Sequence, residues 1–176
     1  MILPKPINFK VERYIGGLSQ FKKINNPIKL SANESALGPS PKVIQAIEKD
    51  KDKIFKYPES DSNSLIEVLS NKFNIDSKRI ICGSGSDQIF DLTCHLFLKP
   101  GDEVVVTEFG FIMHRIYASL YKAKVILAKE KNFKASVDEI LNKVTNKTKI
   151  VFIANPNNPT GTYLSKDEML SLRKKL

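Results

Sequence analysis

The sequence predicts a three-layer α/β/α fold with a mostly parallel, incomplete sheet that is preceded by an amino-terminal arm and helices. Two patterns predict this fold. From residue 79 onward, short apolar runs alternate with amphipathic ones, which is typical of strands and helices in turn. Before residue 79 only helical periodicity appears. The composition agrees, since 41% hydrophobic and 27% charged residues in a chain of 176 are ordinary for a globular domain.

The expected elements follow in chain order. An irregular arm and a loop at 33–41 precede helices at 42–54 and 62–73. Beyond them we expect strand 79–82, helix 87–98, strand 103–107, helix 112–121, strand 124–128, helix 136–144 and strand 149–154. Ser165 and Glu168 have capping-box spacing and begin a last helix. Because the sequence stops at Leu176, the last βα unit is expected to be unfinished.

The domain division predicted from these patterns has three parts. Residues 1–28 are the arm, residues 29–78 are a region of loop and helices, and residues 79–176 are the α/β part. Cys82 and Cys94 stand twelve positions apart without a nearby His cluster, so we expect two buried, reduced thiols and no metal site. No signal-peptide pattern and no run near 18 apolar residues occurs, which predicts a cytoplasmic protein without a membrane partner.

The net charge of +9 does not point to nucleic acid. Nucleic-acid surfaces cluster their basic residues and favour arginine, whose planar fork binds phosphate with two hydrogen bonds. Here the lysines are spread along the chain, and the arginines are only Arg13, Arg79, Arg115 and Arg173. We therefore expect solvated lysines and no nucleic-acid partner.

The most specific segment follows the last expected strand and reads Asn155-Pro156-Asn157-Asn158-Pro159-Thr160-Gly161. Prolines stiffen this loop, and the carboxyl end of a strand is where open α/β sheets bind ligands. A run of Asn, Pro and Gly is also an ordinary turn, so spacing alone leaves both interpretations open.

A second segment follows the strand expected at 79–82 and reads Gly83-Ser84-Gly85-Ser86-Asp87-Gln88. Small residues allow close approach of a ligand, and the free amides of a helix start attract phosphate. Gln88 stands where a dinucleotide fold has its third glycine, and no Lys-Ser/Thr pair of a P-loop follows. Glycine-rich turns are common, so this segment is weak evidence by itself.

Both segments resemble motifs of one family. The first is similar to the Asn-Pro-x-Asn-Pro-Thr-Gly signature of class I and II aminotransferases, which depend on pyridoxal 5'-phosphate (PLP). The second resembles the Gly-x-Gly-Ser-Asp-Glu turn of the histidinol-phosphate aminotransferase family. The resemblance implies the PLP-dependent transferase (aspartate aminotransferase-like) fold. It also implies that Asn158 binds the phenolic oxygen of PLP and that Ser86, Asp87 and Gln88 hold its phosphate, although Gln88 replaces the usual glutamate.

Further stretches agree with this family in order. Residues 29–40 are similar to its Lys-Leu-x-x-Asn-Glu-Asn-Pro-x-Gly-Pro-Ser segment, which makes Asn33 and Gly38 candidates for substrate binding. Tyr57 matches a tyrosine that reaches the PLP phosphate of the neighbouring subunit, so the resemblance implies a homodimer with residues 29–78 at the small-domain and dimer-contact region. Tyr14 matches an element that closes over substrate. Taken alone, each stretch fits an ordinary loop or a core tyrosine better than a functional site.

One aromatic residue is also matched. Phe109 follows the strand expected at 103–107, where the family places a ring that stacks on the pyridine of PLP; Phe111 is the alternative. Aromatic rings near strand ends usually belong to a core. His95 and His114 lie between apolar residues and are interpreted as structural or surface groups.

The resemblance implies amino transfer between L-glutamate/2-oxoglutarate and a small phosphorylated amine or carbonyl compound, as in histidine biosynthesis. In the family, the lysine that binds PLP covalently, the aspartate that pairs with its pyridinium nitrogen and the substrate-binding arginines lie beyond the Asn-Pro loop. The family places this lysine in a Ser-x-x-Lys motif, and we assign none of the lysines of this chain to that role, so the chain has no predicted catalytic residue and is expected to be inactive as given. A lyase resembling threonine-phosphate decarboxylase, an aminotransferase for another phosphorylated amine, and a non-catalytic domain for a phosphorylated ligand or a protein partner remain alternatives.

Overall fold

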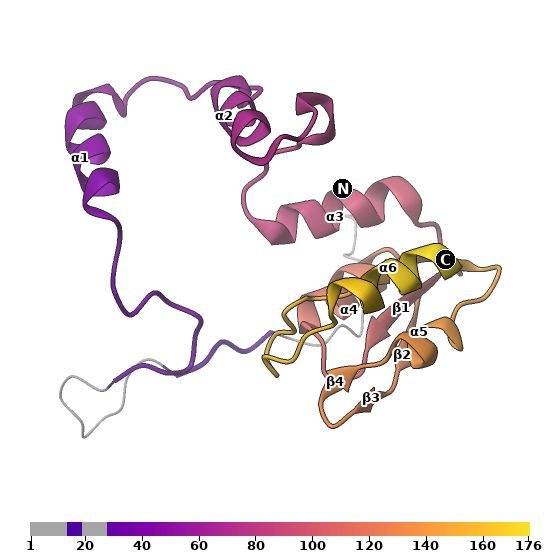
Figure 1. Cartoon of the computed structure of the whole chain (residues 1–176). Helices are drawn as coiled ribbons and strands as arrows, with labels where there is room; N and C mark the ends of the chain where they lie inside the picture. Colours follow the sequence, from indigo (N-terminus) through magenta and orange to yellow (C-terminus); the bar gives the residue numbers. More distant parts are fainter. Residues whose placement is uncertain (1–13, 19–27) are drawn as a thin grey trace, which may run out of the picture. The chain divides into compact units, whose positions relative to one another are not determined.

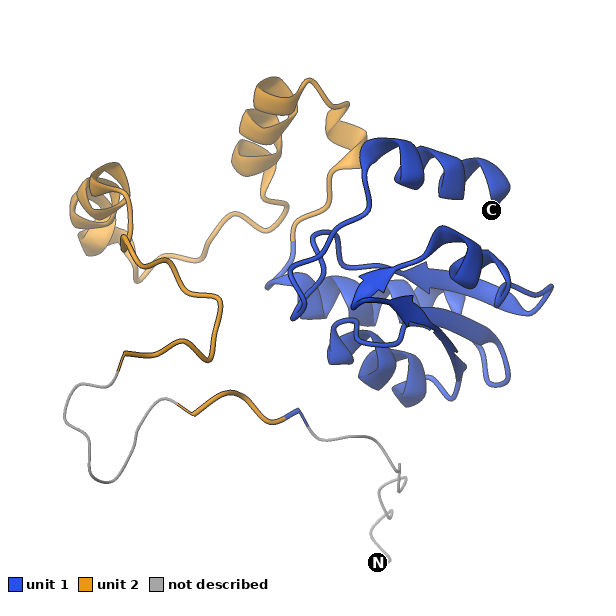
Figure 2. Cartoon of the chain, turned by 60° about the horizontal axis from the view of Figure 1, so that its bottom comes forward, with its two compact units in different colours: residues 1–14, 83–176 blue, residues 15–82 orange. Residues whose placement is uncertain are grey.

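The computed structural model describes residues 14–18 and 28–176, which belong to two compact units (Figure 2). The helical unit spans residues 15–82, and the sheet unit comprises residues 83–176 together with Tyr14 at its described amino-terminal end. The division falls between Cys82 and Gly83, four residues after the boundary expected from sequence.

The described residues of the helical unit, 15–18 and 28–82, form two α-helices and two 3-10 turns. Helix α1 spans Pro41–Asp50 and is followed by the 3-10 turn η1 at Lys51–Lys53, whereas one helix had been expected through residue 54. Helix α2 spans Asn63–Phe73 and ends at Asn74, whose left-handed conformation (φ 52°) stops the helix. The second turn, η2, spans Ser77–Arg79.

The prediction of a strand at 79–82 is wrong. Ile80 has extended backbone angles (φ −114°, ψ 127°), but no strand in the described part of the chain pairs with residues 80–82. A strand requires hydrogen bonds to a neighbour, and an apolar run does not supply that neighbour.

The sheet unit is built on three parallel strands in the order β2-β1-β5. Strands β1 and β2 are labelled in Figure 1. Strands β1 (Glu103–Thr107) and β2 (Lys124–Ala128) have the predicted bounds, and β5 spans Thr148–Phe152. Parallel neighbours need crossover connections, which helices α4 (Ile112–Leu120) and α5 (Val137–Leu141) provide. A short antiparallel hairpin of β3 (Glu130–Lys131) and β4 (Lys134–Ala135) was not predicted.

Strand β1 is buried along its whole length and divides the core into two layers. Val104 and Val106 pack on one face with Ala118 of α4. Val105 packs on the opposite face with Ile140 of α5 and Leu172 of α6 (Lys166–Lys175). Helices therefore cover both faces of a parallel sheet, which confirms the predicted three-layer α/β fold.

The strand order creates a switch point at the carboxyl ends of β1 and β5. The chain moves from β1 outward to β2 and then crosses back over the other face to β5, so β1 and β5 are neighbours. The loop after β1 leads to α4 on one face, and the loop after β5 leads to α6 on the other. Such diverging loops form the crevice in which open α/β sheets bind ligands.

No helix among residues 14–18 and 28–176 is long and apolar enough to cross a membrane.

Candidate functional site

The Asn-Pro loop after β5 is held by two of its three asparagine side chains. The Asn155 amide brackets Leu164, because its Oδ1 accepts from the Leu164 N–H at 2.8 Å and its Nδ2 donates to the Leu164 carbonyl at 3.0 Å. Asn157 is buried, and its Nδ2 donates to Thr160 Oγ1 at 2.9 Å. The Asn158 side chain, in contrast, makes no hydrogen bond to any residue that the structure describes, so its amide is available to a ligand.

The loop after β1 adjoins the Asn-Pro loop. Asn157 Nδ2 lies 3.4 Å from the Phe109 carbonyl oxygen, so the two loops meet at the switch point. Gly110 allows the sharp turn after Phe109, since a Cβ at this position would lie 2.4 Å from Thr107 Oγ1. Phe109 is 43% exposed rather than buried in the core. Phe109 and Asn158 therefore stand on neighbouring loops at one end of the sheet.

Helix α3 (Ser86–Phe97) begins with unsatisfied backbone donors. Gly85 precedes it with φ +84° and ψ 174°, a conformation that is essentially restricted to glycine, and no side chain caps the helix. The first N–H groups of a helix have no partner within it, and with the helix dipole they form an anion site. The backbone amides of Ser86, Asp87 and Gln88 are these groups.

The Gln88 side chain stabilises the same turn by a hydrogen bond to its backbone. Its Oε1 accepts a hydrogen bond from the Ser84 N–H at 2.6 Å. A Cβ at Gly83 would lie 2.9 Å from this oxygen, so glycine lets the turn fold tightly against Gln88. Gln88 can thus offer a ligand its backbone N–H, while its side chain holds the loop.

An aromatic cluster places the start of α3 at the carboxyl end of the sheet, where open α/β sheets bind ligands. The Phe90 ring lies 5.6 Å from that of Phe152, the last residue of β5, and 6.3 Å from Phe111 in the loop after β1. Because Phe90 is only one helical turn after Ser86, the turn at residues 83–88 lies at the same end of the unit as the loops after β1 and β5.

His114 belongs to this cluster. Its ring stacks on Phe152 (4.9 Å, 12°) and meets Phe90 edge to face at 4.8 Å. Burial lowers the pKa of His114 from 6.5 to about 4, so its imidazole is neutral near pH 7. The aromatic cluster therefore contains no charged imidazole near pH 7.

Ser86, Asp87, Gln88, Phe109 and Asn158 all belong to the sheet unit. Asn33, Gly38 and Tyr57 belong to the helical unit, where all three are exposed. Tyr14 is also exposed, and the predicted roles of these four residues stay predictions.

Sequence reasoning missed several residues that shape the loops. Asn157, Arg115 and Glu130 each bury a polar atom without a hydrogen-bond partner in the described structure, and all three contact residues 108–109. The interaction of Glu130 spans 21 residues, and no local pattern announces it. Across the described ranges, no group of three or more His, Cys, Asp or Glu side chains is arranged to hold a metal ion.

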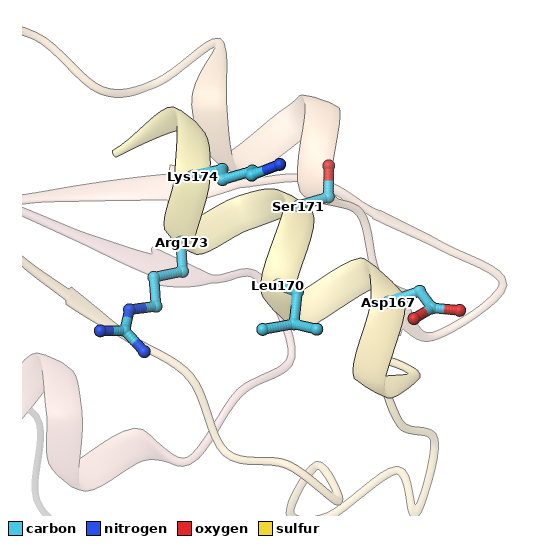
Figure 3. A pocket seen from close by; sticks show the side chains of 5 residues that line it. All are labelled: Asp167, Leu170, Ser171, Arg173 and Lys174. Carbon is cyan, nitrogen blue, oxygen red and sulfur yellow. The ribbon is translucent and has the colours of Figure 1, made fainter.

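Two hollows lie along α6, away from the predicted site residues. One of about 600 Å³ is lined, among the described residues, by Asp167, Leu170, Ser171, Arg173 and Lys174 of this helix (Figure 3). Another of about 310 Å³ lies against the edge strand β5. Its described lining residues are Val151, Ile153, Met169, Leu172, Arg173 and Leu176. None of the predicted ligand-binding residues lines either one.

Comparison with known proteins decides the family. Residues 25–175 match the model of the class I and II aminotransferases. The chain belongs to this family. Histidinol-phosphate aminotransferases from Pelagibacter ubique and Paramagnetospirillum magneticum are 56% and 41% identical over 100% and 97% of the chain. The matches cover 49% and 47% of those proteins, so the chain spans about half the length of these relatives.

Solved structures show the same fold. The histidinol-phosphate aminotransferase of Sinorhizobium meliloti, solved in complex with pyridoxal 5'-phosphate, superimposes with a TM-score of 0.79 at 23% identity. The match covers 82% of this chain and 40% of that one. A protein from Erwinia carotovora atroseptica, described as a putative histidinol-phosphate aminotransferase, has a TM-score of 0.77 at 25% identity and covers 84% of this chain and 43% of its own.

Proposed function

We propose that the chain forms part of the PLP site of an aminotransferase that acts on histidinol phosphate or a related phosphorylated amine, with L-glutamate/2-oxoglutarate as the second substrate pair. The observation that carries the proposal is the convergence of an uncapped helix start, an exposed aromatic ring and a free amide at one switch point. Relatives that are up to 56% identical and carry the name histidinol-phosphate aminotransferase support the substrate assignment.

The α3 start fits a phosphate group. Gly85 turns the backbone so that the amides of Ser86, Asp87 and Gln88 follow without a cap, and Ser86 adds an exposed hydroxyl. These donors bind an anion through hydrogen bonds and the helix dipole and need no side-chain cation. The internal use of the Gln88 side chain explains why glutamine is acceptable here.

The two loops fit an aromatic ring with a phenolic oxygen. Phe109 offers an exposed ring for stacking, and the Asn158 amide offers a donor to the oxygen. When bound, PLP supplies an electron sink for chemistry at the substrate Cα. The residues of this chain would orient the ring and shield one of its faces from water.

The rest of the reaction needs groups that this sequence does not contain in the family's context. We propose that the 176-residue chain does not catalyse transamination by itself, because it spans about half of its relatives' length and the family resemblance places the lysine that binds PLP covalently beyond the Asn-Pro loop. We also propose that the enzyme works as a homodimer in which Tyr57 contacts the cofactor phosphate of the neighbouring subunit.

A PLP titration of the chain tests the cofactor proposal, followed by absorbance and induced circular dichroism in the cofactor band. Asn158→Ala should weaken binding about ten- to a hundredfold, the effect of losing a hydrogen bond to a charged group. Asn146→Ala is the matched control, since Asn146 is exposed in the loop that precedes β5, at the opposite end of the strand. Equal affinities of the two variants would contradict the role of Asn158.

Two further readouts test the statement about catalysis. Borohydride treatment of the PLP-loaded chain should leave no stoichiometric lysine adduct by mass spectrometry. Histidinol phosphate and 2-oxoglutarate should show no turnover. A robust rate or a single modified lysine would contradict the proposal. Binding of inorganic phosphate with the same affinity as PLP, unchanged by Asn158→Ala, would favour the non-catalytic phosphate-binding alternative.

A further inference from the structure

The β3–β4 hairpin has an unusual residue at its tip. The two turn residues, Asn132 and Phe133, have φ values of +53° and +60°, so the turn is of type I′. Asparagine and glycine favour this turn, whereas a bulky side chain is strained in the left-handed region. A phenylalanine at this position indicates that contacts of its side chain offset the backbone strain.

Phe133 contacts both loops of the candidate site. Its ring centroid lies 5.2 Å from that of Phe109 at an interplanar angle of 50°. Its carbonyl oxygen accepts a hydrogen bond from Thr162 Oγ1 at 2.7 Å. The hairpin tip therefore joins the loop after β1 to the loop after β5.

Glu130, at the base of the hairpin, holds the Phe109 backbone. Its Oε1 accepts from the Phe109 N–H at 3.2 Å, and its own N–H lies 3.4 Å from Glu108 Oε2. On the other side, the Phe109 carbonyl accepts from Asn157. Both polar groups of the Phe109 backbone are thus bound by side chains from other elements, while 43% of the residue stays exposed.

We infer that Glu130 and Phe133 are positioning residues that hold Phe109 in its ligand-stacking orientation. The inference rests on the proposed function only in assigning PLP as the ligand of the ring. A ring on an exposed loop loses conformational freedom when it binds a ligand, and a brace that restricts the ring beforehand removes part of that cost. Without the brace, PLP affinity should fall about two- to tenfold, the effect of immobilising one side chain.

Four variants test the inference. Glu130→Ala removes the acceptor, and Glu130→Gln keeps an oxygen that can accept the same hydrogen bond. Phe133→Gly removes the ring and relieves the strained φ. Lys131→Ala is the control on the same hairpin, because its ammonium is exposed and only approaches Glu139 at 3.9 Å. Each variant is measured by NMR without ligand, by PLP titration and by thermal unfolding.

In Glu130→Ala we expect the Phe109 amide to exchange about tenfold faster, as for a backbone amide that loses roughly 1.4 kcal/mol of protection. The cross-peaks between the two phenylalanine rings should weaken. Glu130→Gln and Lys131→Ala should behave like the wild type. Phe133→Gly should unfold near the wild-type temperature and still bind PLP two- to tenfold more weakly. A purely structural role predicts instead that stability and affinity change together.

Different results overturn the two proposals. Unchanged Phe109 exchange in Glu130→Ala, or wild-type PLP affinity in a variant whose Phe109 is loosened, refutes the positioning role. Loosening of Phe109 in a chain whose wild type does not bind PLP supports the positioning role and refutes the cofactor assignment. If Glu130→Ala fails to fold, the affinity and melting temperature of Phe133→Gly decide the question.

Discussion

Replacing Gly85 by alanine separates backbone conformation from side-chain chemistry at the proposed phosphate site. At φ +84° and ψ 174°, a residue other than glycine is strained by about 1–3 kcal/mol. A Cβ there would meet no atom within 4 Å, so no steric clash adds to the strain. Alanine recovers about 0.4–1 kcal/mol by restricting the unfolded chain. The expected net loss in the free energy of unfolding is about 1–2 kcal/mol.

The effect on PLP binding should be larger than the effect on stability alone implies. Relaxing the strain rotates the peptide that carries the Ser86 N–H, which removes a donor from the phosphate. Losing one hydrogen bond to a charged ligand weakens binding about ten- to a hundredfold. Urea denaturation measures stability, and PLP titration under conditions where every variant is folded measures affinity.

Gly101→Ala is the matched control. Gly101 has φ +91°, a Cβ there also meets no atom within 4 Å, and it lies just before β1, at the amino end of the strand. It should lose similar stability and keep wild-type affinity for PLP. The reasoning is refuted if Gly85→Ala binds PLP like the wild type, or if Gly101→Ala weakens binding equally.

Three other predictions concern titration and capping in the sheet unit. Burial lowers the pKa of His114 from 6.5 to about 4, so between these pH values the unfolded chain binds a proton that the folded chain does not. The free energy of unfolding should therefore fall by roughly 3 kcal/mol as the pH drops from 6.5 to 4. His114→Phe should flatten this pH dependence, as measured by urea denaturation. Ser165→Ala should lower the free energy of unfolding by about 1 kcal/mol, because it removes the cap of α6. Hydrogen bonding to the Ser165 N–H lowers the pKa of Glu168 from 4.5 to about 2. The stabilisation from Glu168 is therefore present above pH 4.5, should be lost as the pH falls toward 2, and should be absent in Glu168→Gln. Burial raises the pKa of the Cys94 thiol to about 11, so iodoacetamide should modify Cys82 first in the folded protein and both thiols alike in urea, as peptide mapping would show.

Local sequence patterns predicted several elements correctly. Strands β1 and β2 have the expected bounds because five-residue apolar or alternating runs between turns leave little freedom in where a strand begins. The α6 start was predicted from Ser165 and Glu168, and both hydrogen bonds of the capping box are present. These features depend on residues a few positions apart.

Elements that depend on distant partners were predicted poorly. The apolar run at 79–82 forms no strand, because pairing has to come from a neighbour and the described residues supply none. The β3–β4 hairpin was missed since its strands have two residues each and its turn holds Asn132-Phe133 instead of a glycine pair. Helix α5 is shorter than the expected 136–144 and ends at Leu141.

The sequence by itself determined the fold class, the family and which loops are the candidates for ligand binding, because these follow from periodicity and from contiguous motifs such as the one that contains Asn158. Only the tertiary structure decided how the site residues are held. It assigned Asn155 and Asn157 to bracing the loop, turned the Gln88 side chain inward, and brought Glu130 to Phe109. The physical reason is that hydrogen bonds and ring contacts depend on distances in space, and chain segments twenty or more residues apart come together only when the sheet and its crossovers have formed.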